Sequence, residues 1–304
     1  MGSIADKLTY LSGTKTAIKE AIKAKGVTVT DTDTFRSYAT KIGQISGGGA
    51  PATKYGATID NILGNVDTNG AYQFPTEPFT LDMSSVKSLP SFGLYYKFYK
   101  SSVSGVLTIG LEGDLSVSSA MQSCFQNCKS LTSVNLSSLT TVSGSYAMES
   151  CFNDCTNITD INLSSLTTIS GSSSMYNCFY ACYGLTNVNF SALTTVSGDN
   201  AMRNCFSLCN SLTNVNFSAL TTVSGSSAMR SCFSNCVAMT TISFPALTSI
   251  ASNAFGTSSA TYIFSGCTAL TEIHFRADMQ ATIEAMKGYA DKWGATSSTI
   301  YFDL

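Results

Sequence analysis

Cysteine is the residue type with the most obvious capacity for chemistry in this 304-residue chain. The five-residue motif C-F-x-x-C occurs five times, each copy 27 residues after the previous one, and supplies ten of the eleven cysteines. The copies begin at Cys124, Cys151, Cys178, Cys205 and Cys232. This spacing differs from that of zinc ligands, and cysteines four residues apart pair poorly within a helical turn. We expect reduced thiols that fill a buried position in every repeat, with bridges between equivalent cysteines of neighbouring repeats as the alternative.

Few other residues have the spacing of a catalytic or metal site. The single histidine, His274, stands at a strand position that holds Asn or Ser in other repeats, so we expect an exposed residue. Asn65-x-Asp67-x-Asn69-Gly70 imitates half of a calcium loop, but Thr76 stands where the closing carboxylate is needed, which favours a plain turn. No phosphate loop, H-E-x-x-H or G-x-S-x-G motif occurs. The sequence predicts no enzyme, no cofactor and no metal site.

The composition excludes two classes of partner. Charged residues make up 12% of the chain and the net charge is −2, which gives no electrostatic support for nucleic-acid binding. No run of about 18 apolar residues is present, so we expect no membrane insertion. The opening residues lack a basic segment followed by an apolar one, so no export signal is expected.

The constant period predicts a solenoid, in which each unit buries its apolar face against its neighbours. An alternating segment such as Ile161-Asn162-Leu163 predicts a short strand, the Ser-Gly pairs predict turns, and M-x-x-C-F-x-x-C predicts one short helical or 3₁₀ turn. Eight strand positions follow, and they begin at Leu81, Leu107, Val134, Ile161, Val188, Val215, Ile242 and Ile273. The predicted fold is an α/β repeat solenoid of the leucine-rich-repeat type.

The segments around the repeats predict the domain order. The solenoid covers residues 79–276, and residues 277–304 form a C-terminal cap. In the cap, Met279, Ile283 and Met286 lie on one face of a helix that ends near Gly288, and Trp293 is a core anchor.

The first 46 residues have a different composition and predict a small helical attachment module. Residues 47–54 form a Gly-rich linker, and residues 55–78 connect it to the solenoid. The side chains expected at the attachment surface are Leu8, Leu11, Ile18 and Ile22 on a first helix, with Phe35 and Tyr38 on a second. The apolar seam of the first helix can also drive self-association into a homo-oligomer.

Deviations from the repeat mark the candidate contact residues. The outward strand positions hold Asn, Thr and Ser, a pattern that we interpret mainly as a wetted sheet surface. Tyr176, Tyr180 and Tyr183 instead stand where the neighbouring repeats hold polar residues, so three tyrosines are predicted to cluster on the surface. Exposed aromatic side chains are typical recognition elements. Arg203 and Arg230, adjacent in one column of the array, add a predicted contact to an anionic group.

The repeat string C-F-x-N-C-x-S-L-T-x-V-N-L resembles the BspA-type leucine-rich repeats over about residues 79–276. That family is found on bacterial surfaces and elsewhere, so the resemblance implies the fold without a ligand. In this chain Cys stands where the common unit has Ala before phenylalanine.

The two ends resemble segments of tail and fibre proteins of gut bacteriophages and prophages. The resemblance covers A-D-K-L-T-Y-L near the start, K-Y-G-A-T-I-D-N-I-L-G-N-V-D, and the closing H-F-R-A-D-M-Q-A-T-I-E-A-M. It implies a non-enzymatic virion protein whose residues 1–46 dock to other virion proteins and whose repeats bind a glycan or protein on the host surface. The alternative is a bacterial cell-surface adhesin, and a weaker one is an accessory module of an enzyme.

Overall fold

The computed structural model describes residues 16, 18–20, 55–56 and 77–304. The chain divides into two units, Met1–Lys54 and Tyr55–Leu304. In the first unit, residue 16 and residues 18–20 are helical, within the segment where the sequence predicts a helix. The rest of the predicted attachment module, the Gly-rich linker and the Asn-Gly turn lie outside the described residues.

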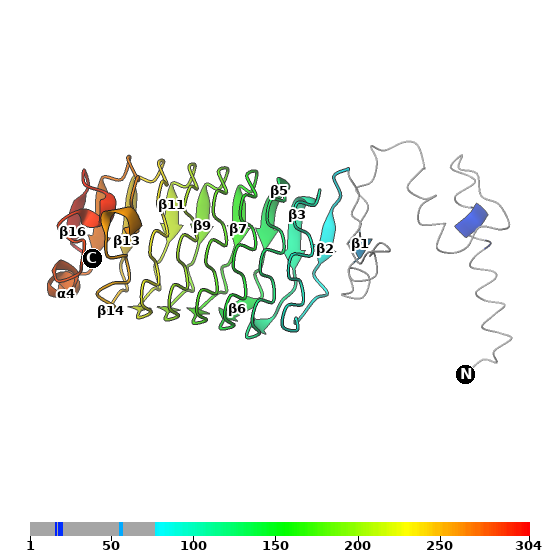
Figure 1. The fold of residues 1–304 in the computed structure, drawn as a ribbon, viewed down its shortest axis with the longest axis horizontal. Coiled ribbons are helices and arrows are strands. Elements are labelled where there is room, and N and C mark those ends of the chain that lie inside the picture. Colours follow the sequence, from blue (N-terminus) through cyan, green and yellow to red (C-terminus); the bar gives the residue numbers. More distant parts are fainter. Residues whose placement is uncertain (1–15, 17, 21–54, 57–76) are drawn as a thin grey trace. The chain divides into compact units, whose positions relative to one another are not determined.

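The second unit is a stack of coils joined by parallel strands (Figure 1). Along one side these strands form a seven-stranded sheet and then a three-stranded sheet, which we together call the first sheet. All eight predicted strand positions are confirmed: β2 (Leu81–Met83), β3 (Ser104–Ile109), β5 (Ser130–Asn135), β7 (Asp160–Asn162), β9 (Asn187–Asn189), β11 (Asn214–Asn216), β13 (Thr241–Phe244) and β15 (Glu272–Phe275). The strand β1 (Tyr55–Gly56) pairs with β2, and β16 (Thr299–Phe302) pairs with β15. Equivalent residues face each other across the pairs, such as Ile161 and Val188. The leucine-rich-repeat solenoid is therefore confirmed.

A second parallel sheet lies on another side of the coils, and the sequence analysis missed it. Its strands are β4 (Gly113–Asp114), β6 (Leu139–Val142), β8 (Thr168–Ile169), β10 (Thr195–Val196), β12 (Thr222–Val223) and β14 (Ser249–Ile250). Most of these strands have only two residues, too few to show an alternating pattern. Threonine hydroxyls strengthen the sheet edge from coil to coil, as where Thr194 Oγ1 donates to Thr167 O at 3.1 Å.

The third side of each coil is a run of turns where the sequence predicts a short helical or 3₁₀ turn. We call it the turn ladder; it comprises residues 92–100, 119–127, 146–154, 173–181, 200–208 and 227–235. Successive N–H groups alternate between two partners. Cys178 N donates within its coil to Met175 O at 3.1 Å, whereas Asn177 N donates to Arg203 O of the next coil at 3.0 Å.

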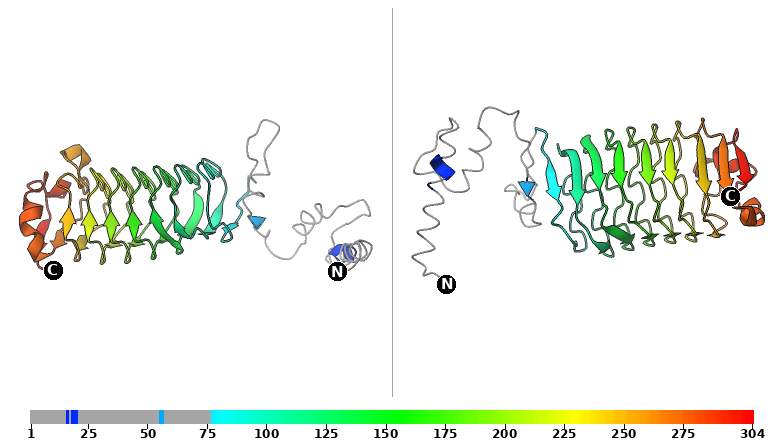
Figure 2. Two further views of the ribbon diagram at one scale, coloured as in Figure 1. Left: turned by 90° about the horizontal axis from the view of Figure 1, so that it is seen from below. Right: turned by 180° about the vertical axis from the view of Figure 1, so that it is seen from behind.

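The backbone of the turn ladder cannot continue as a helix. Every fourth residue has a positive φ; in one coil these are Ser173 at 51°, Asn177 at 52° and Ala181 at 57°. A left-handed residue interrupts the right-handed helix and turns the next N–H toward the neighbouring coil. The ladder is therefore a third hydrogen-bonded side of the solenoid (Figure 2). We call the surface formed by its outward side chains, together with those of the short corner that follows it in each coil, such as Tyr183, the turn face.

Identical core residues stack from coil to coil. The phenylalanine ring of each C-F-x-x-C motif lies almost parallel to that of the next. For Phe152 and Phe179, the ring centroids are 5.3 Å apart and the interplanar angle is 2°. The row runs through Phe98, Phe125, Phe152, Phe179, Phe206, Phe233 and Phe264. All seven rings are buried. This row holds the turn ladder against the two sheets.

The glycine of each Ser-Gly pair is needed for close packing of the coils. A Cβ on Gly198 would lie 2.2 Å from Gly171 O in the preceding coil, and one on Gly171 would lie 2.3 Å from Gly144 O. These glycines do not have a positive φ. The predicted reason, a turn conformation, is therefore replaced by a steric one.

The C-terminal segment, residues 277–304, packs against the last coils through Trp293, whose ring contacts Phe255 and Phe275. It contains η2 (Ala277–Met279), α4 (Gln280–Glu284) and η3 (Lys292–Gly294), and Met279, Ile283 and Met286 are buried. Trp293 is a core anchor: its side chain is fully buried, and its Nε1 donates to Lys287 O at 2.9 Å. The helix is shorter than predicted, because α4 ends at Glu284 and Gly288 belongs to the following turns.

Candidate recognition surface on the turn face

The turn ladder places equivalent side chains in straight columns. One column contains Tyr95, Gln122, Glu149, Tyr176, Arg203 and Arg230. Its backbone is fixed from coil to coil, since Ser150 N donates to Tyr176 O at 2.8 Å and Asn204 N donates to Arg230 O at 2.9 Å. Neighbouring members therefore stand about 4.8 Å apart, the ordinary spacing of hydrogen-bonded strands.

The predicted tyrosines all lie on the turn side of the solenoid. Tyr183 is 42% exposed, and Tyr176 and Tyr180 are half-buried. In the described part of the chain, no ring–ring contact joins the three. Tyr176 instead contacts the next coil, where Arg203 Cζ lies 5.3 Å from its ring centroid. The three tyrosines are therefore neighbours without ring contacts, and the guanidinium of Arg203 lies over one of the rings.

The two predicted arginines are adjacent, and neither has a counter-ion among the described residues. The ion pairs of the described residues do not include Arg203 or Arg230, and the Nε of Arg203 is buried without a hydrogen-bond partner. Burial and, second, the charge of Arg203 lower the pKa of Arg230. The pair is a local concentration of positive charge on a chain with few charges.

The acidic residue of the column that lies nearest to the two arginines is hydrogen-bonded to another side chain. Glu149 stands one coil before Tyr176, and its Oε2 accepts a hydrogen bond from Gln122 Nε2 at 2.7 Å. Partial burial raises the pKa of the Glu149 carboxyl. Along this column, a hydrogen-bonded amide and carboxyl group are therefore followed by the ring of Tyr176 and then by the guanidiniums of Arg203 and Arg230.

A second aromatic group on the turn face was missed by the sequence analysis. Phe92, Tyr95, Tyr96 and Tyr99 are 57%, 41%, 43% and 38% exposed, and they contact one another edge to face. Tyr95 and Tyr99 occupy the same columns as Tyr176 and Tyr180, three coils earlier, or about 14 Å away. The repeat is degenerate at this end, so the alignment of these residues with the columns was not recognised.

The polar ladder on the first sheet is engaged within the coils. The Oδ1 atoms of Asn135, Asn162, Asn189 and Asn216 each accept the N–H of the serine two residues further on. Threonine hydroxyls on the same side donate to carbonyls of the preceding coil, such as Thr186 Oγ1 to Thr159 O at 3.3 Å. These bonds agree with the interpretation of the ladder as a structural surface.

The cysteines are free, buried thiols, as expected. The second cysteine of each C-F-x-x-C motif also donates a hydrogen bond to the preceding coil. For example, Cys155 Sγ donates to Phe125 O at 3.0 Å. Ser101 occupies this column in the first coil and lies 3.4 Å from Cys128 Sγ. Burial raises the pKa of Cys128 to about 11 and that of Cys267 to about 12. These thiols are structural groups held in the neutral form.

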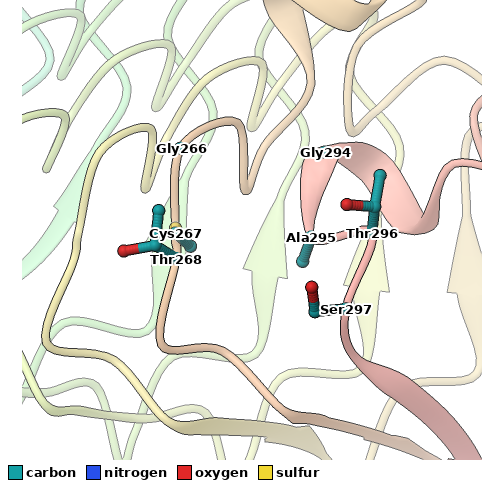
Figure 3. A pocket seen from close by; sticks show the side chains of 7 residues that line it. All are labelled: Gly266, Cys267, Thr268, Gly294, Ala295, Thr296 and Ser297. Atoms are coloured by element: carbon teal, nitrogen blue, oxygen red, sulfur yellow. The ribbon is translucent and has the colours of Figure 1, made fainter.

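No other site of obvious chemistry is found in the described residues. Within them, no group of three or more His, Cys, Asp or Glu residues is placed to hold a metal ion. His274 is half-buried, contrary to the prediction: it stacks on Tyr301 with centroids 4.7 Å apart, and its Nδ1 lies 2.9 Å from Asp303 Oδ1. A hollow of about 250 Å³ between the last coil and the cap is lined by small uncharged residues around Cys267 and Thr296 (Figure 3).

The predicted attachment surface lies almost wholly outside the described residues. Ile18 lies in the short described helix, whereas Leu8, Leu11, Ile22, Phe35 and Tyr38 lie outside the described residues. In the described part of the chain, no helix is both long enough and apolar enough to cross a bilayer.

Comparison with known proteins identifies the repeats. The BspA type leucine rich repeat region matches in six copies over residues 96–206 and 147–261, together more than half of the chain. None of the curated proteins matches. A leucine rich cell surface protein from Faecalibacterium prausnitzii A2-165 is 13% identical, with a TM-score of 0.24, over 76% of this chain and 79% of that chain.

Proposed function

This chain belongs to the BspA-type leucine-rich-repeat family, and we propose that it is a non-enzymatic binding protein that adheres to a cell surface through its turn face. The observation that carries the proposal is the row of side chains from Tyr176 to Arg230, where an aromatic ring and two guanidiniums without an ion pair among the described residues follow one another on the turn face. A rigid array of coils holds these groups at fixed distances, so little conformational entropy is lost on binding.

The other faces are poorer candidates for contact. On the first sheet, the asparagine and threonine side chains already bond their own coils. In the second sheet, Thr167, Thr194 and Thr221 are engaged in the same way. The turn face differs because it carries large side chains with free donors and exposed rings, which are the groups that dominate binding energy at interfaces.

A binding experiment with matched variants tests the proposal. In the turn-face variant, Tyr180→Asn and Tyr183→Thr bring in the residues that the preceding coil has at these positions, and Tyr176→Ser replaces the third ring by a small polar side chain. The control carries Asn187→Ser and Asn214→Ser, which change only the first sheet. Labelled protein is titrated onto epithelial and bacterial cells. We expect the turn-face variant to bind about tenfold or more weakly. Equal binding of all three proteins, or no binding by the unmodified protein, would refute the proposal.

We propose bacterial or virion exposure as the two settings for this adhesion. The cell-surface setting needs only the family's repeat architecture, whereas virion attachment rests on the resemblance of residues 1–46 and the closing segment to phage proteins. Antibody labelling against residues 79–276 separates them. Label on intact cells supports the first setting, and label on purified particles supports the second.

A further inference from the structure

We propose that Arg203 and Arg230 form an anion-binding pair and that the anionic group belongs to an acidic saccharide, one that carries a carboxylate or a sulfate. The inference rests on the proposed recognition function and names the class of its ligand. The two residues stand one coil apart in a single column, because the backbone N–H of Asn204 donates to Arg230 O. Both side chains are half-buried on the turn face.

The argument begins with the unbalanced charge. Two guanidiniums on neighbouring coils repel each other, and neither has an ion pair among the described residues. Arg203 also has a buried Nε without a partner. The nearby Glu149 is engaged by Gln122 on the far side of Tyr176. A bound carboxylate or sulfate would relieve the repulsion and accept hydrogen bonds from both forks.

The surroundings of the pair favour a sugar over a free anion. Tyr180 stands in the adjacent column, which continues beside the two arginines as Ser207, which is buried, and Ser234, which is half-buried and can offer its hydroxyl. Along this column, an aromatic side chain is therefore followed by small side chains with hydroxyl groups. An aromatic ring can cover the apolar face of a sugar ring, and hydroxyls can bond its polar edge. An inorganic anion would use only the guanidiniums.

The backbone argues against an extended peptide. Peptides that add to a sheet need unpaired main-chain groups at an open edge. In this part of the ladder the groups are already paired from coil to coil, as between Asn177 N and Arg203 O and between Asn204 N and Arg230 O. Recognition here must therefore use side chains.

The test compares three related saccharides: lactose, sialyllactose and sulfated lactose. Their affinities are measured by isothermal titration calorimetry with the full-length protein and with an Arg203→Gln/Arg230→Gln variant. We expect both acidic sugars, or the one of matching geometry, to bind at least about tenfold more tightly than lactose, and the variant to lose this preference. The preference should also fall as salt is raised.

Controls separate this inference from the proposed function. Lys129→Gln removes a cation that is already paired with Asp154 at 3.7 Å, so it should leave the preference unchanged. Without ligand, the double arginine variant should melt at about the same temperature, because the loss of the repulsion offsets the loss of the contact between Arg203 and the Tyr176 ring. Equal binding of lactose and the acidic sugars, or an unchanged preference in the double variant, would overturn the inference. If cell binding then still depends on the tyrosines, the recognition function survives with an uncharged ligand.

Discussion

Arg203 lies over the ring of Tyr176 from the preceding coil, with its Cζ 5.3 Å from the ring centroid. The contact joins an aromatic deviation from the repeat to a cationic one, and it holds the guanidinium at a fixed place on the turn face. Because Arg230 follows in the same column, the three side chains act as one row. The first prediction concerns the strength of this contact.

A double-mutant cycle with Tyr176→Ser and Arg203→Gln should give a coupling energy of about 0.5–1 kcal/mol, the usual size of a partly exposed cation–π contact. The free energies of unfolding are measured by urea titration. The cycle cancels the separate effect of removing the repulsion between Arg203 and Arg230. A coupling energy indistinguishable from zero would show that the contact does not hold Arg203 in place.

Replacement of Gly198 by alanine should destabilise the protein strongly. The new Cβ would lie 2.2 Å from Gly171 O, so two coils must move apart. We expect a loss of about 3 kcal/mol or more in the free energy of unfolding, measured in urea. Gly113→Ala is the control: it has a φ of 70° but no heavy atom within 4 Å of the new Cβ, and should cost about 1–2 kcal/mol. Similar losses in both would contradict the steric explanation.

The buried thiols should make the protein less stable in alkali. Burial raises the pKa of Cys128 from 9.0 to about 11, so the thiol stays neutral in the folded state while the unfolded chain loses its proton. The buried thiol contributes fully to the free energy of unfolding below the pKa of the unfolded state. This contribution is lost as the pH rises toward the pKa of the folded state. Each such thiol should lower the free energy of unfolding by about 1.4 kcal/mol per pH unit in this window.

Alkylation provides an independent check on the thiols. With iodoacetamide at about pH 8, the folded protein should stay unmodified, whereas all eleven cysteines should react in urea. Mass spectrometry counts the additions. Rapid modification of the folded protein, or stability that is unchanged above about pH 9, would mean that the thiols are not held neutral in the core.

Trp293 should anchor the C-terminal cap. The variant Trp293→Phe loses the hydrogen bond to Lys287 O and leaves a void beside Phe255, whose ring centroid lies 5.3 Å from that of Trp293. We expect a loss of about 1–3 kcal/mol in urea unfolding followed by circular dichroism. Tyr301→Phe, on an exposed position of β16, should change the stability by less than about 0.5 kcal/mol.

The sequence predicted what depends on long-range periodicity. The strand positions from Leu107 to Ile242 and the thiols of the five C-F-x-x-C motifs recur at 27-residue steps, and Leu81 and Ile273 continue the pattern at steps of 26 and 31. The same columns placed Tyr176, Tyr180 and Tyr183 on one side of the coils. In each case the pattern itself contains the structural information.

The sequence could not predict features that depend on backbone geometry between coils. The spacing of M-x-x-C-F-x-x-C fits a helical turn, but left-handed residues such as Asn177 direct N–H groups to the next coil. The packing role of Gly198 and the orientation of Arg203 over Tyr176 likewise depend on neighbouring coils. The group around Tyr96 was missed because the repeat is degenerate there.

Hydroxyl-radical footprinting of the protein, alone and bound to cell-surface material, tests the central claim most directly. Tyrosine side chains are oxidised readily, so mass spectrometry can follow each exposed ring separately. If the turn face is the recognition surface, binding should protect Tyr176 and Tyr183 from oxidation. The oxidation of Tyr301, which lies in β16, should not change. Protection of Tyr301 while both turn-face tyrosines stay fully reactive would contradict the assignment of recognition to the turn face.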